Sequence, residues 1–282
     1  METITSTDEL RAQVRAWRRE GLLVGLVPTM GFLHEGHESL IKKASLQNHR
    51  VVVSVFVNPM QFDNANDLST YPRSEERDNE ICEQAGAHVV FRPSVEEMYP
   101  PGFCSYVDMD GITDQLCGAT RPGHFRGVCT VVAKLFCMVQ PDAAYFGQKD
   151  AQQLAVIRRM ATDLNMGIKV VGCPIVRESD GLAMSSRNTH LSKDERKASL
   201  CLSQALSSAQ EMLDQGEREV AKIVNHMRER FDQEPLARID YVSIVDAENL
   251  QPVEQVEAPV LVALAVFIGN TRLIDNFVFE GK

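Results

Sequence analysis

The first 177 residues alternate between apolar runs of strand length and segments with apolar side chains at helical spacing. The strand-like runs are residues 22–27, 51–57, 87–91, 106–109, 143–146 and 168–172. The helix-like segments are the one with Leu10, Val14 and Trp17 at helical spacing after the cap candidates Thr5–Thr7, and residues 37–47, 74–85, 128–139 and 151–164. Strands that alternate with helices are typical of a parallel sheet covered on both faces. The pattern therefore predicts an α/β domain with a parallel sheet over residues 1–177.

The alternation stops near residue 178. Two long amphipathic helices are expected first, over residues 193–214 and 217–231. Three strand candidates follow in direct succession, at residues 238–245, 260–267 and 273–278. Helices followed by consecutive strands predict a second, smaller α+β domain over residues 178–282.

Composition narrows the functional class. The chain has 282 residues and a net charge of −10, which disfavours a nucleic-acid partner because such proteins carry a basic surface. Its longest apolar stretch, residues 259–269, is shorter than the roughly 20 residues of a membrane helix, and no signal peptide is expected. The seven cysteines include no Cys-x-x-Cys pair, which predicts reduced thiols and a cytoplasmic protein.

The charge is distributed unevenly between the two expected domains. Residues 1–177 carry 18 basic and 21 acidic side chains, and residues 178–282 carry 11 and 18. The first domain is therefore nearly balanced, and an anionic ligand is easier to accommodate there.

The segment Pro28–His37 is the first candidate site. It lies where an expected strand ends and a helix begins, which is where open α/β sheets bind ligands. A helix N-terminus attracts anions, and His34 and His37 are one helical turn apart, so both imidazoles can face the same phosphate chain. Metal binding by the two histidines is the alternative, although no third ligand is nearby in the sequence.

Three further segments carry polar residues at element ends. Gln61, in Asn58–Phe62, offers an amide that suits a ligand with hydroxyl and carboxylate groups. Lys149, in Gly147–Asp150, lies between a strand and a helix and can meet phosphate oxygens. The third segment, Val176–Asn188, provides two serine hydroxyls and a guanidinium at the domain boundary.

Taken together, these segments resemble the pantothenate synthetase (pantoate–β-alanine ligase) family, which is related to class I aminoacyl-tRNA synthetases. The resemblance also rests on Tyr71–Arg73 and on Arg121–Gly127, and it runs nearly end to end. Neither a Gly-x-x-x-x-Gly-Lys-Ser/Thr loop nor a Gly-x-Gly-x-x-Gly loop after a strand is present, so a P-loop or a standard dinucleotide fold is not supported.

The resemblance implies a Rossmann-like N-terminal domain, a C-terminal lid and a homodimer formed through the N-terminal domain. It implies an ATP-dependent condensation of (R)-pantoate and β-alanine through pantoyl adenylate, with Mg²⁺ on the ATP phosphates. No organic prosthetic group, nucleic-acid partner or membrane is implied, and which residues hold the metal is left open.

The resemblance also implies roles for individual residues. The implied ATP contacts are Met30, Gly31, Phe32, Leu33, His34, Glu35, Gly36, His37, Gly147, Gln148, Lys149, Asp150, Val176, Met184, Ser185, Ser186 and Arg187. The implied catalytic residues are His34, His37, Lys149, Ser185 and Arg187, with His37 as a proton donor.

Substrate contacts follow from the same resemblance. Gln61 would contact pantoate and β-alanine, Gln153 would contact pantoate, and Val131 and Val132 would surround the gem-dimethyl group of pantoate.

Two positions depart from the family pattern. Gln148 stands where the family usually has glutamate, and Cys117 stands where it has an acidic residue. Two other functions remain open: a nucleotidyltransferase that stops at an adenylylated or cytidylylated product, and a nucleotide sensor without catalysis. An aminoacyl-tRNA synthetase is disfavoured because no basic or additional RNA-binding domain is expected.

Overall fold

The computed structural model describes residues 1–63 and 65–281 of the chain. The chain divides into two compact units, each made of more than one segment. Unit 1 comprises Met1–Asp110, Arg121–Gln148 and Val156–Pro174. Unit 2 comprises Gly111–Thr120, Lys149–Ala155 and Ile175–Lys282.

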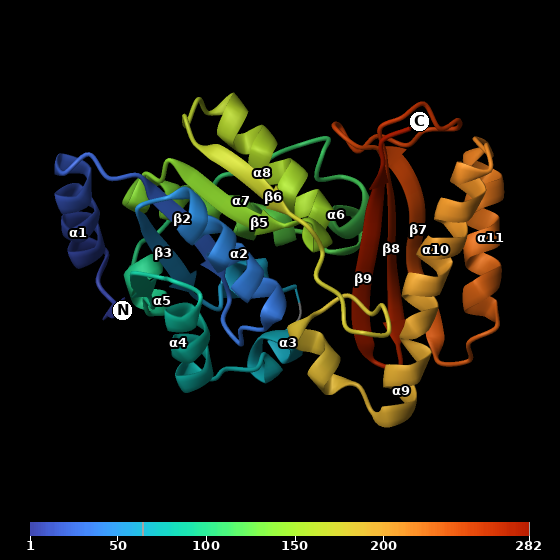
Figure 1. Cartoon of the computed structure of the whole chain (residues 1–282), viewed down its shortest axis with the longest axis horizontal. Helices are drawn as coiled ribbons and strands as arrows, with labels where there is room; N and C mark the ends of the chain where they lie inside the picture. The colour runs from blue at the N-terminus through green and yellow to red at the C-terminus, as the bar shows by residue number, and fades with distance from the viewer. Residues whose placement is uncertain (64, 282) are drawn as a thin grey trace. The chain divides into compact units, whose positions relative to one another are not determined.

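Unit 1 is built on a six-stranded sheet in which every pairing is parallel (Figure 1), as the alternating pattern predicts. The strand order is β1-β4-β3-β2-β5-β6. The strands are β1 (Glu2–Ile4), β2 (Val24–Thr29), β3 (Arg50–Val55), β4 (Val89–Phe91), β5 (Ala143–Gly147) and β6 (Lys169–Cys173). These strands are continuously apolar because a sheet that is covered on both faces buries consecutive side chains.

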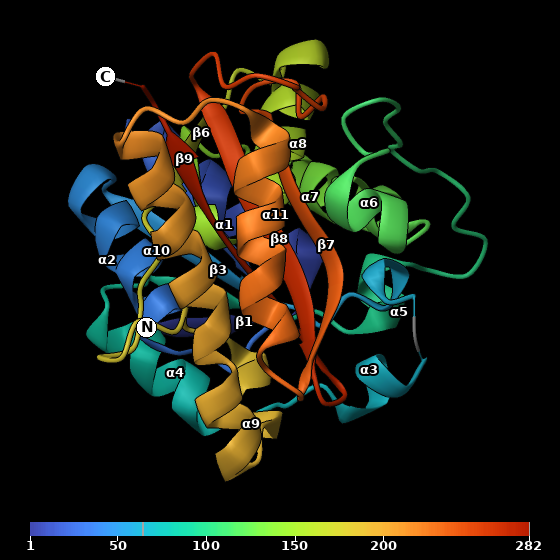
Figure 2. The same cartoon turned by 90° about the vertical axis from the view of Figure 1, so that its right-hand side faces the viewer.

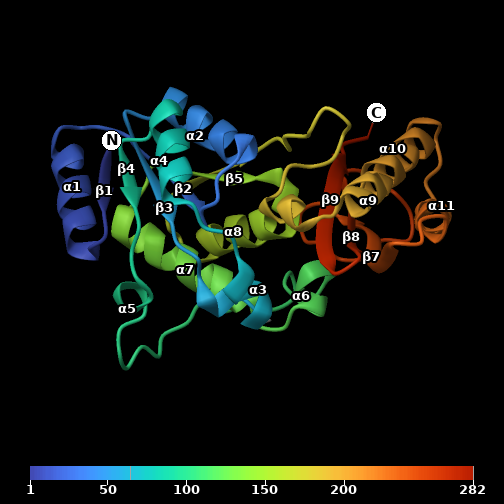
Figure 3. The same cartoon turned by 90° about the horizontal axis from the view of Figure 1, so that it is seen from below.

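Helices cover both faces of this sheet (Figure 3). On one face, side chains of α2 (Glu35–Gln47) and α4 (Glu75–Gln84) pack against the strands in one apolar cluster. On the other face lie α1 (Thr7–Arg19) and α7 (His124–Val139), with α8 (Ala151–Asp163) beside α7. Shorter helices in the middle of the chain include η1 (Pro59–Gln61), α3 (Ala65–Thr70), α5 (Val95–Met98) and η2 (Gln148–Asp150).

The sheet differs from the expectation at two places. The strand expected at residues 106–109 is wrong, because this segment pairs with no strand among the described residues. Instead, the Thr130 hydroxyl of α7 accepts the Val107 N–H at 3.0 Å, so a side chain takes the place of a neighbouring strand. The edge strand β1 was not expected, because three residues are too few for a periodic signal.

Unit 2 contains an antiparallel sheet of three strands in the order β7-β8-β9 (Figure 2). The strands are β7 (Ala237–Asp246), β8 (Val260–Ile268) and β9 (Thr271–Phe279). The helices α10 (Leu200–Asp214) and α11 (Val220–Asp232) pack against one face in a single apolar cluster. The arrangement confirms the predicted combination of an α/β sheet domain and a small α+β domain.

The helix expected over residues 193–214 is two helices, which corrects the prediction. A short helix, α9 (Lys193–Ala198), ends before Ser199, and α10 begins at Leu200. The Ser199 hydroxyl donates to the Arg196 carbonyl at 2.7 Å, and such a local side-chain bond competes with the regular helical pattern.

The remaining short elements of unit 2 are α6 (Leu116–Thr120) and η3 (Ser186–His190). Among the described residues, no helix is both long and apolar enough to cross a membrane.

Candidate active site

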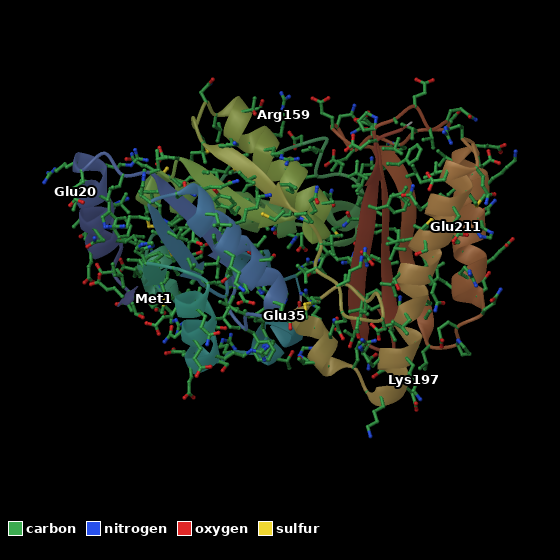
Figure 4. The ribbon with its side chains drawn as sticks, in the orientation of Figure 1. Met1, Glu20, Glu35, Arg159, Lys197 and Glu211 are labelled. Carbon is green, nitrogen blue, oxygen red and sulfur yellow. The ribbon has the colours of Figure 1, made fainter. Side chains whose placement is uncertain are left out.

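The first site-forming segment in unit 1 is the loop between β2 and α2, residues 30–34. Gly31 has φ +82°, and a Cβ there would lie 2.9 Å from both the Asp78 carboxylate and the Val55 side chain. Glycine is therefore needed at this position for both its backbone angle and its lack of a side chain. Glu35, labelled in Figure 4, is the first residue of α2.

A buried carboxylate fixes this loop. Asp78 is 2% exposed, and its two oxygens accept the N–H groups of Phe32 at 3.1 Å and Leu33 at 2.7 Å. Burial raises the pKa of the Asp78 carboxyl, while the two amide donors and nearby arginines act in the opposite direction. The loop backbone is thus held before any ligand arrives.

His34 and His37 use the same ring nitrogen in the same way. His34 is the N-cap of α2, and its Nδ1 accepts the Gly36 N–H at 3.1 Å. The Nδ1 of His37 accepts the His34 N–H at 3.3 Å, and the two ring centroids are 4.1 Å apart. Because a backbone N–H can only donate, each neutral ring carries its proton on Nε2. Both imidazoles are therefore set up as Nε2–H donors.

Gln61 is oriented by a buried amide. Asn58 is 1% exposed, and its Nδ2 donates to Gln61 Oε1 at 3.0 Å and to the Gly127 carbonyl at 3.1 Å. The Tyr99 hydroxyl donates to Asn58 Oδ1 at 2.7 Å, which fixes the amide of Asn58. The Nε2 group of Gln61 consequently faces Met30, 3.2 Å from its sulfur. The structure thus brings two of the predicted contacts together.

The backbone of Gln61 is held as well. His124 Nδ1 donates to the Gln61 carbonyl at 2.8 Å, and Arg121 donates both to that carbonyl at 3.2 Å and to His124 Nε2 at 3.3 Å. A Cβ on Gly127 would lie 2.4 Å from the Met60 carbonyl, so α7 and η1 can approach this closely only with glycine.

Val131 and Val132 follow Gly127 on α7 and are 7% and 3% exposed. Val131 lies one helical turn beyond Gly127, on the side of α7 that packs on η1. This position suits the predicted apolar contact with a substrate held by Gln61.

Unit 2 contains the second group of predicted residues. Lys149 is half-buried in η2, and its carbonyl accepts a hydrogen bond from Asn276 Nδ2 at 2.8 Å. Gln153 is half-buried in the first turn of α8. The neighbouring Gln152 is 5% exposed and donates to the carbonyls of Ile112 at 3.1 Å and Gln115 at 2.7 Å. The hydrogen bonds of Lys149 and Gln152 therefore explain why residues 149–155 belong to unit 2.

The predicted segment 176–187 is a closed loop in unit 2. The Met184 N–H donates to the Val176 carbonyl at 3.0 Å, which joins the two ends of the loop. Ser185 then caps η3, because its hydroxyl oxygen accepts the Arg187 N–H at 3.3 Å. The Ser185 hydroxyl keeps its own proton to donate. Ser186 is buried.

Two arginines hold this loop through three ion pairs. Arg177 makes a two-point contact with Asp275 of β9, at 2.7 and 3.0 Å. Arg196 of α9 contacts Glu178 at 2.6 Å and Asp180 at 2.8 Å. A loop of this length without regular structure is otherwise poorly ordered, so these charged side chains define its path.

The two departures from the family pattern occupy different settings. Cys117 is buried in unit 2, where its sulfur lies 3.3 Å from the Tyr241 hydroxyl and 3.6 Å from the Arg272 guanidinium. Gln148 is half-buried in η2. Within residues 1–63 and 65–281, no group of three or more His, Cys, Asp or Glu side chains could hold a metal ion.

Several supporting residues were not assigned a role from the sequence. Asp78 and Asp275 each stand where the periodicity calls for an apolar side chain. Asp78 precedes Cys82 by one helical turn on the buried side of α4, and Asp275 follows Leu273 by two residues on the same face of β9. A carboxylate at an apolar position is the signal that could have identified them.

Comparison with known proteins decides the family. The model of the pantoate-beta-alanine ligase family matches residues 2–278. The chain belongs to the pantoate–β-alanine ligase family. It is accordingly an ATP-using ligase. Proteins named pantothenate synthetase are 57% identical in Heliobacterium modesticaldum, over 99% of this chain and 100% of the relative, and 54% identical in Ruminiclostridium cellulolyticum, over 99% of both.

Solved structures of the family have the same fold. The pantothenate synthetase of Thermus thermophilus matches with a TM-score of 0.92 and 46% identity, covering 98% of this chain and 99% of that one. The pantoate–β-alanine ligase of Francisella tularensis, solved as a complex with beta-gamma ATP and β-alanine, matches with a TM-score of 0.80 and 33% identity, covering 99% and 97%.

Proposed function

We propose that this chain condenses (R)-pantoate with β-alanine and converts ATP to AMP and pyrophosphate, through a pantoyl-adenylate intermediate. One observation carries the proposal. The family match spans residues 2–278, and within it the 30–37 loop forms an anion-attracting helix N-terminus with two imidazoles held as Nε2–H donors.

In the first step, a carboxylate oxygen of pantoate attacks the α-phosphorus of ATP, and the bond to pyrophosphate breaks. Negative charge builds on the phosphoryl oxygens, so N–H and O–H donors accelerate the step. We assign this role to His34, His37, Lys149, Ser185 and Arg187. His37, at the third position of α2, is the residue proposed as proton donor: its Nε2–H would hydrogen-bond to a phosphate oxygen while the ring keeps the proton, because pyrophosphate leaves as an anion.

In the second step, the amine of β-alanine attacks the acyl carbon of the adenylate. The bond to AMP breaks, and the proton that the amine loses as the amide forms passes to water. Gln61 is assigned to both pantoate and β-alanine, because its amide is held by Asn58 and can serve as donor and acceptor. Gln153 is assigned to pantoate, and Val131 and Val132 to its gem-dimethyl group.

No enzyme nucleophile is needed in either step. Alignment of the two reactants can supply about 7–11 kcal/mol of barrier reduction. Residues 178–282 are proposed to act as a lid that keeps water from the adenylate. The remaining ATP contacts are proposed to be Met30, Gly31, Phe32, Leu33, Glu35, Gly36, Gly147, Gln148, Asp150, Val176, Met184 and Ser186.

Mg²⁺ is proposed to arrive on the ATP phosphates. Mg²⁺ in nucleotide sites is held mainly by phosphates and water with one or two carboxylates. Bound Mg²⁺ would neutralise phosphate charge. A cytoplasmic location and a homodimer formed through the N-terminal domain are part of the same proposal, and light scattering on the purified protein tests the dimer.

The test is an assay for AMP release with ATP, pantoate and β-alanine, in which each is omitted in turn. AMP should form only when all three are present, while pyrophosphate should form without β-alanine. Pyrophosphate release with no amide on addition of the amine would favour a nucleotidyltransferase instead. ATP binding with neither product would leave only a nucleotide sensor.

A further inference from the structure

Two consecutive residues of β9 reach both segments of unit 2 that are assigned to ATP. Asp275 and Asn276 are 2% and 5% exposed. We propose that they are positioning residues, which fix residues 149–153 and 176–187 on one strand and so set the geometry of the phosphate donors. This inference rests on the proposed function, since it explains how that function's donors are held.

Asp275 holds the 176–187 segment through Arg177. Its Oδ2 accepts from Arg177 at 2.7 Å and its Oδ1 at 3.0 Å, and Oδ1 also accepts the Asn276 N–H at 2.8 Å. Two parallel contacts fix the plane of a guanidinium as well as its position. The same guanidinium donates to the Gly181 carbonyl at 3.0 Å, so one side chain ties the turn that follows it.

The position of Arg177 determines where Ser185, the first proposed phosphate donor of the 176–187 segment, lies. Arg177 pairs with Ala183 in an antiparallel bridge, and Met184 donates to the Val176 carbonyl directly beside it. Ser185 is the next residue, and it caps η3. The first proposed phosphate donor of this loop therefore follows almost directly after the bridge.

Asn276 holds the other segment. Its Nδ2 donates to the Lys149 carbonyl at 2.8 Å, at the residue whose ammonium group is assigned to phosphate. Holding that carbonyl fixes the backbone from which the Lys149 side chain extends. Gln153 lies one helical turn further along the chain, in α8.

Strand alternation explains how two neighbours serve two segments. Side chains of successive strand residues point to opposite faces. Leu273 and Phe279 belong to the apolar cluster with α10 and α11, so Asp275 shares the helix-covered face and Asn276 lies on the other. Continuous pairing of β9 with β8 from Thr271 to Phe279 makes the strand a rigid common support.

Stability alone does not account for the ion pair. Asp275 occupies a position where an apolar residue would be buried at no desolvation cost, and a well-packed apolar pair is often as stable as a buried ion pair. What the ion pair adds is a defined direction for Arg177 and the loop that it holds.

The test compares Asn276→Ala and Asp275→Asn with the wild-type protein. Both variants should raise the KM for ATP, and the Kd of a non-hydrolysable ATP analogue measured by calorimetry, by about tenfold, because a misplacement of about 1 Å in aligned groups can cost about 100-fold and each variant releases only one of the two segments. The KM for β-alanine should stay within about twofold, since Gln61 belongs to unit 1 and neither variant touches it.

Ser208→Ala is the matched control. Ser208 is also buried in unit 2, at 7% exposure, but its hydroxyl makes a local hydrogen bond, to the Ala205 carbonyl at 2.9 Å. Its removal should leave the ATP Kd unchanged. Circular dichroism and thermal unfolding establish that each variant is folded, and Asn276→Ala decides the matter if Asp275→Asn does not fold.

The outcomes separate the two proposals. Folded variants whose ATP Kd and KM stay within twofold of wild type would overturn the positioning role, as would equal increases in the KM values for ATP and β-alanine. If the wild-type protein binds the analogue but forms no AMP, the proposed function fails, and the analogue Kd of the variants still decides the positioning role.

Discussion

The two predicted phosphate-binding loops are each held by a buried aspartate, but in different ways. In unit 1, Asp78 accepts the backbone N–H groups of Phe32 and Leu33 directly. In unit 2, Asp275 contacts a guanidinium, and Arg177 in turn holds the loop. The difference follows from length, because the first loop is short and ends in a helix whereas the second has more than ten residues and little regular structure of its own.

The two regions also offer different donors. The 30–37 loop presents neutral Nε2–H groups, since each Nδ1 is occupied by a backbone N–H. The unit 2 segments present an ammonium and a guanidinium, at Lys149 and Arg187. Hydrogen bonds from charged groups are roughly twice as strong as neutral ones, so in the proposed mechanism the loss of Lys149 should cost more than the loss of either imidazole.

The largest effect is expected for Lys149→Ala. Loss of a charged transition-state donor should lower kcat by about 10²–10³ while the protein stays folded. Steady-state kinetics and thermal unfolding measure the two quantities. Lys197→Ala removes an exposed lysine of α9, labelled in Figure 4, and should leave kcat unchanged. Near-normal turnover of Lys149→Ala would exclude Lys149 from the mechanism. It would also contradict the expectation that charged donors contribute more than the imidazole donors.

Asp78→Asn should destabilise the protein by about 1–3 kcal/mol. The amide oxygen can still accept one loop N–H, but the NH₂ group then faces the other donor. Urea unfolding measures the loss. Glu75→Gln is the matched change on the same helix, at a side chain that is 79% exposed in its ion pair with Arg92, and it should have little effect. Equal losses in the two variants would contradict the anchoring role of Asp78.

Two substitutions of His34 separate its two nitrogens. Asparagine places an acceptor near Nδ1 and no donor near Nε2, whereas glutamine does the reverse. His34→Asn should keep the N-cap and lower kcat about tenfold or more, and His34→Gln should retain more activity but lose about 1 kcal/mol of stability. Kinetics and urea unfolding on both variants test this. The same loss of activity in both variants would show that the assigned Nε2–H is not the relevant group.

The smallest effect concerns His88, which stands just before β4 in the six-stranded sheet of unit 1. His88 Nδ1 accepts the Val51 N–H at 3.2 Å, and burial, with Arg50 nearby, lowers the pKa of His88 below its ordinary value of 6.5. The unfolded chain then binds a proton more readily than the folded protein, so stability should fall as the pH drops below about 6.5.

The expected decrease is about 1–3 °C in Tm between pH 7 and pH 5.5 from this group alone. His88→Asn keeps an acceptor near Nδ1 and cannot titrate, so the difference between the two Tm-versus-pH curves isolates the contribution. Parallel curves would show that Nδ1 acceptance does not keep this ring neutral, and would weaken the same reasoning for His34 and His37.

The fold class could be read from the sequence because burial dictates periodicity. Continuous apolar runs at 51–57 and 143–146 predict strands covered on both sides, and the structure has β3 and β5 there. The strand expected at 106–109 failed because a side chain, Thr130, satisfies the backbone of this segment. An apolar run shows that a segment is buried but not which group pairs with its N–H.

For the site, the sequence by itself determined the residue types and the element ends where they lie. His34, Gln61, Lys149 and Ser185 all follow strands or precede helices, and that placement depends on local signals alone. Local signals also sufficed for the fold class, a parallel α/β sheet with a small antiparallel C-terminal sheet.

Only the tertiary structure decided which atoms hold these residues. Asn58 orients Gln61 within three residues, but Asp78 reaches the 30–37 loop from 45 residues away in the chain and Asp275 reaches Arg177 from 98. Such partners have no fixed sequence spacing, because they meet only after sheets and helices have packed. Burial then makes them consequential, since an amide or a charge removed from water must find a partner.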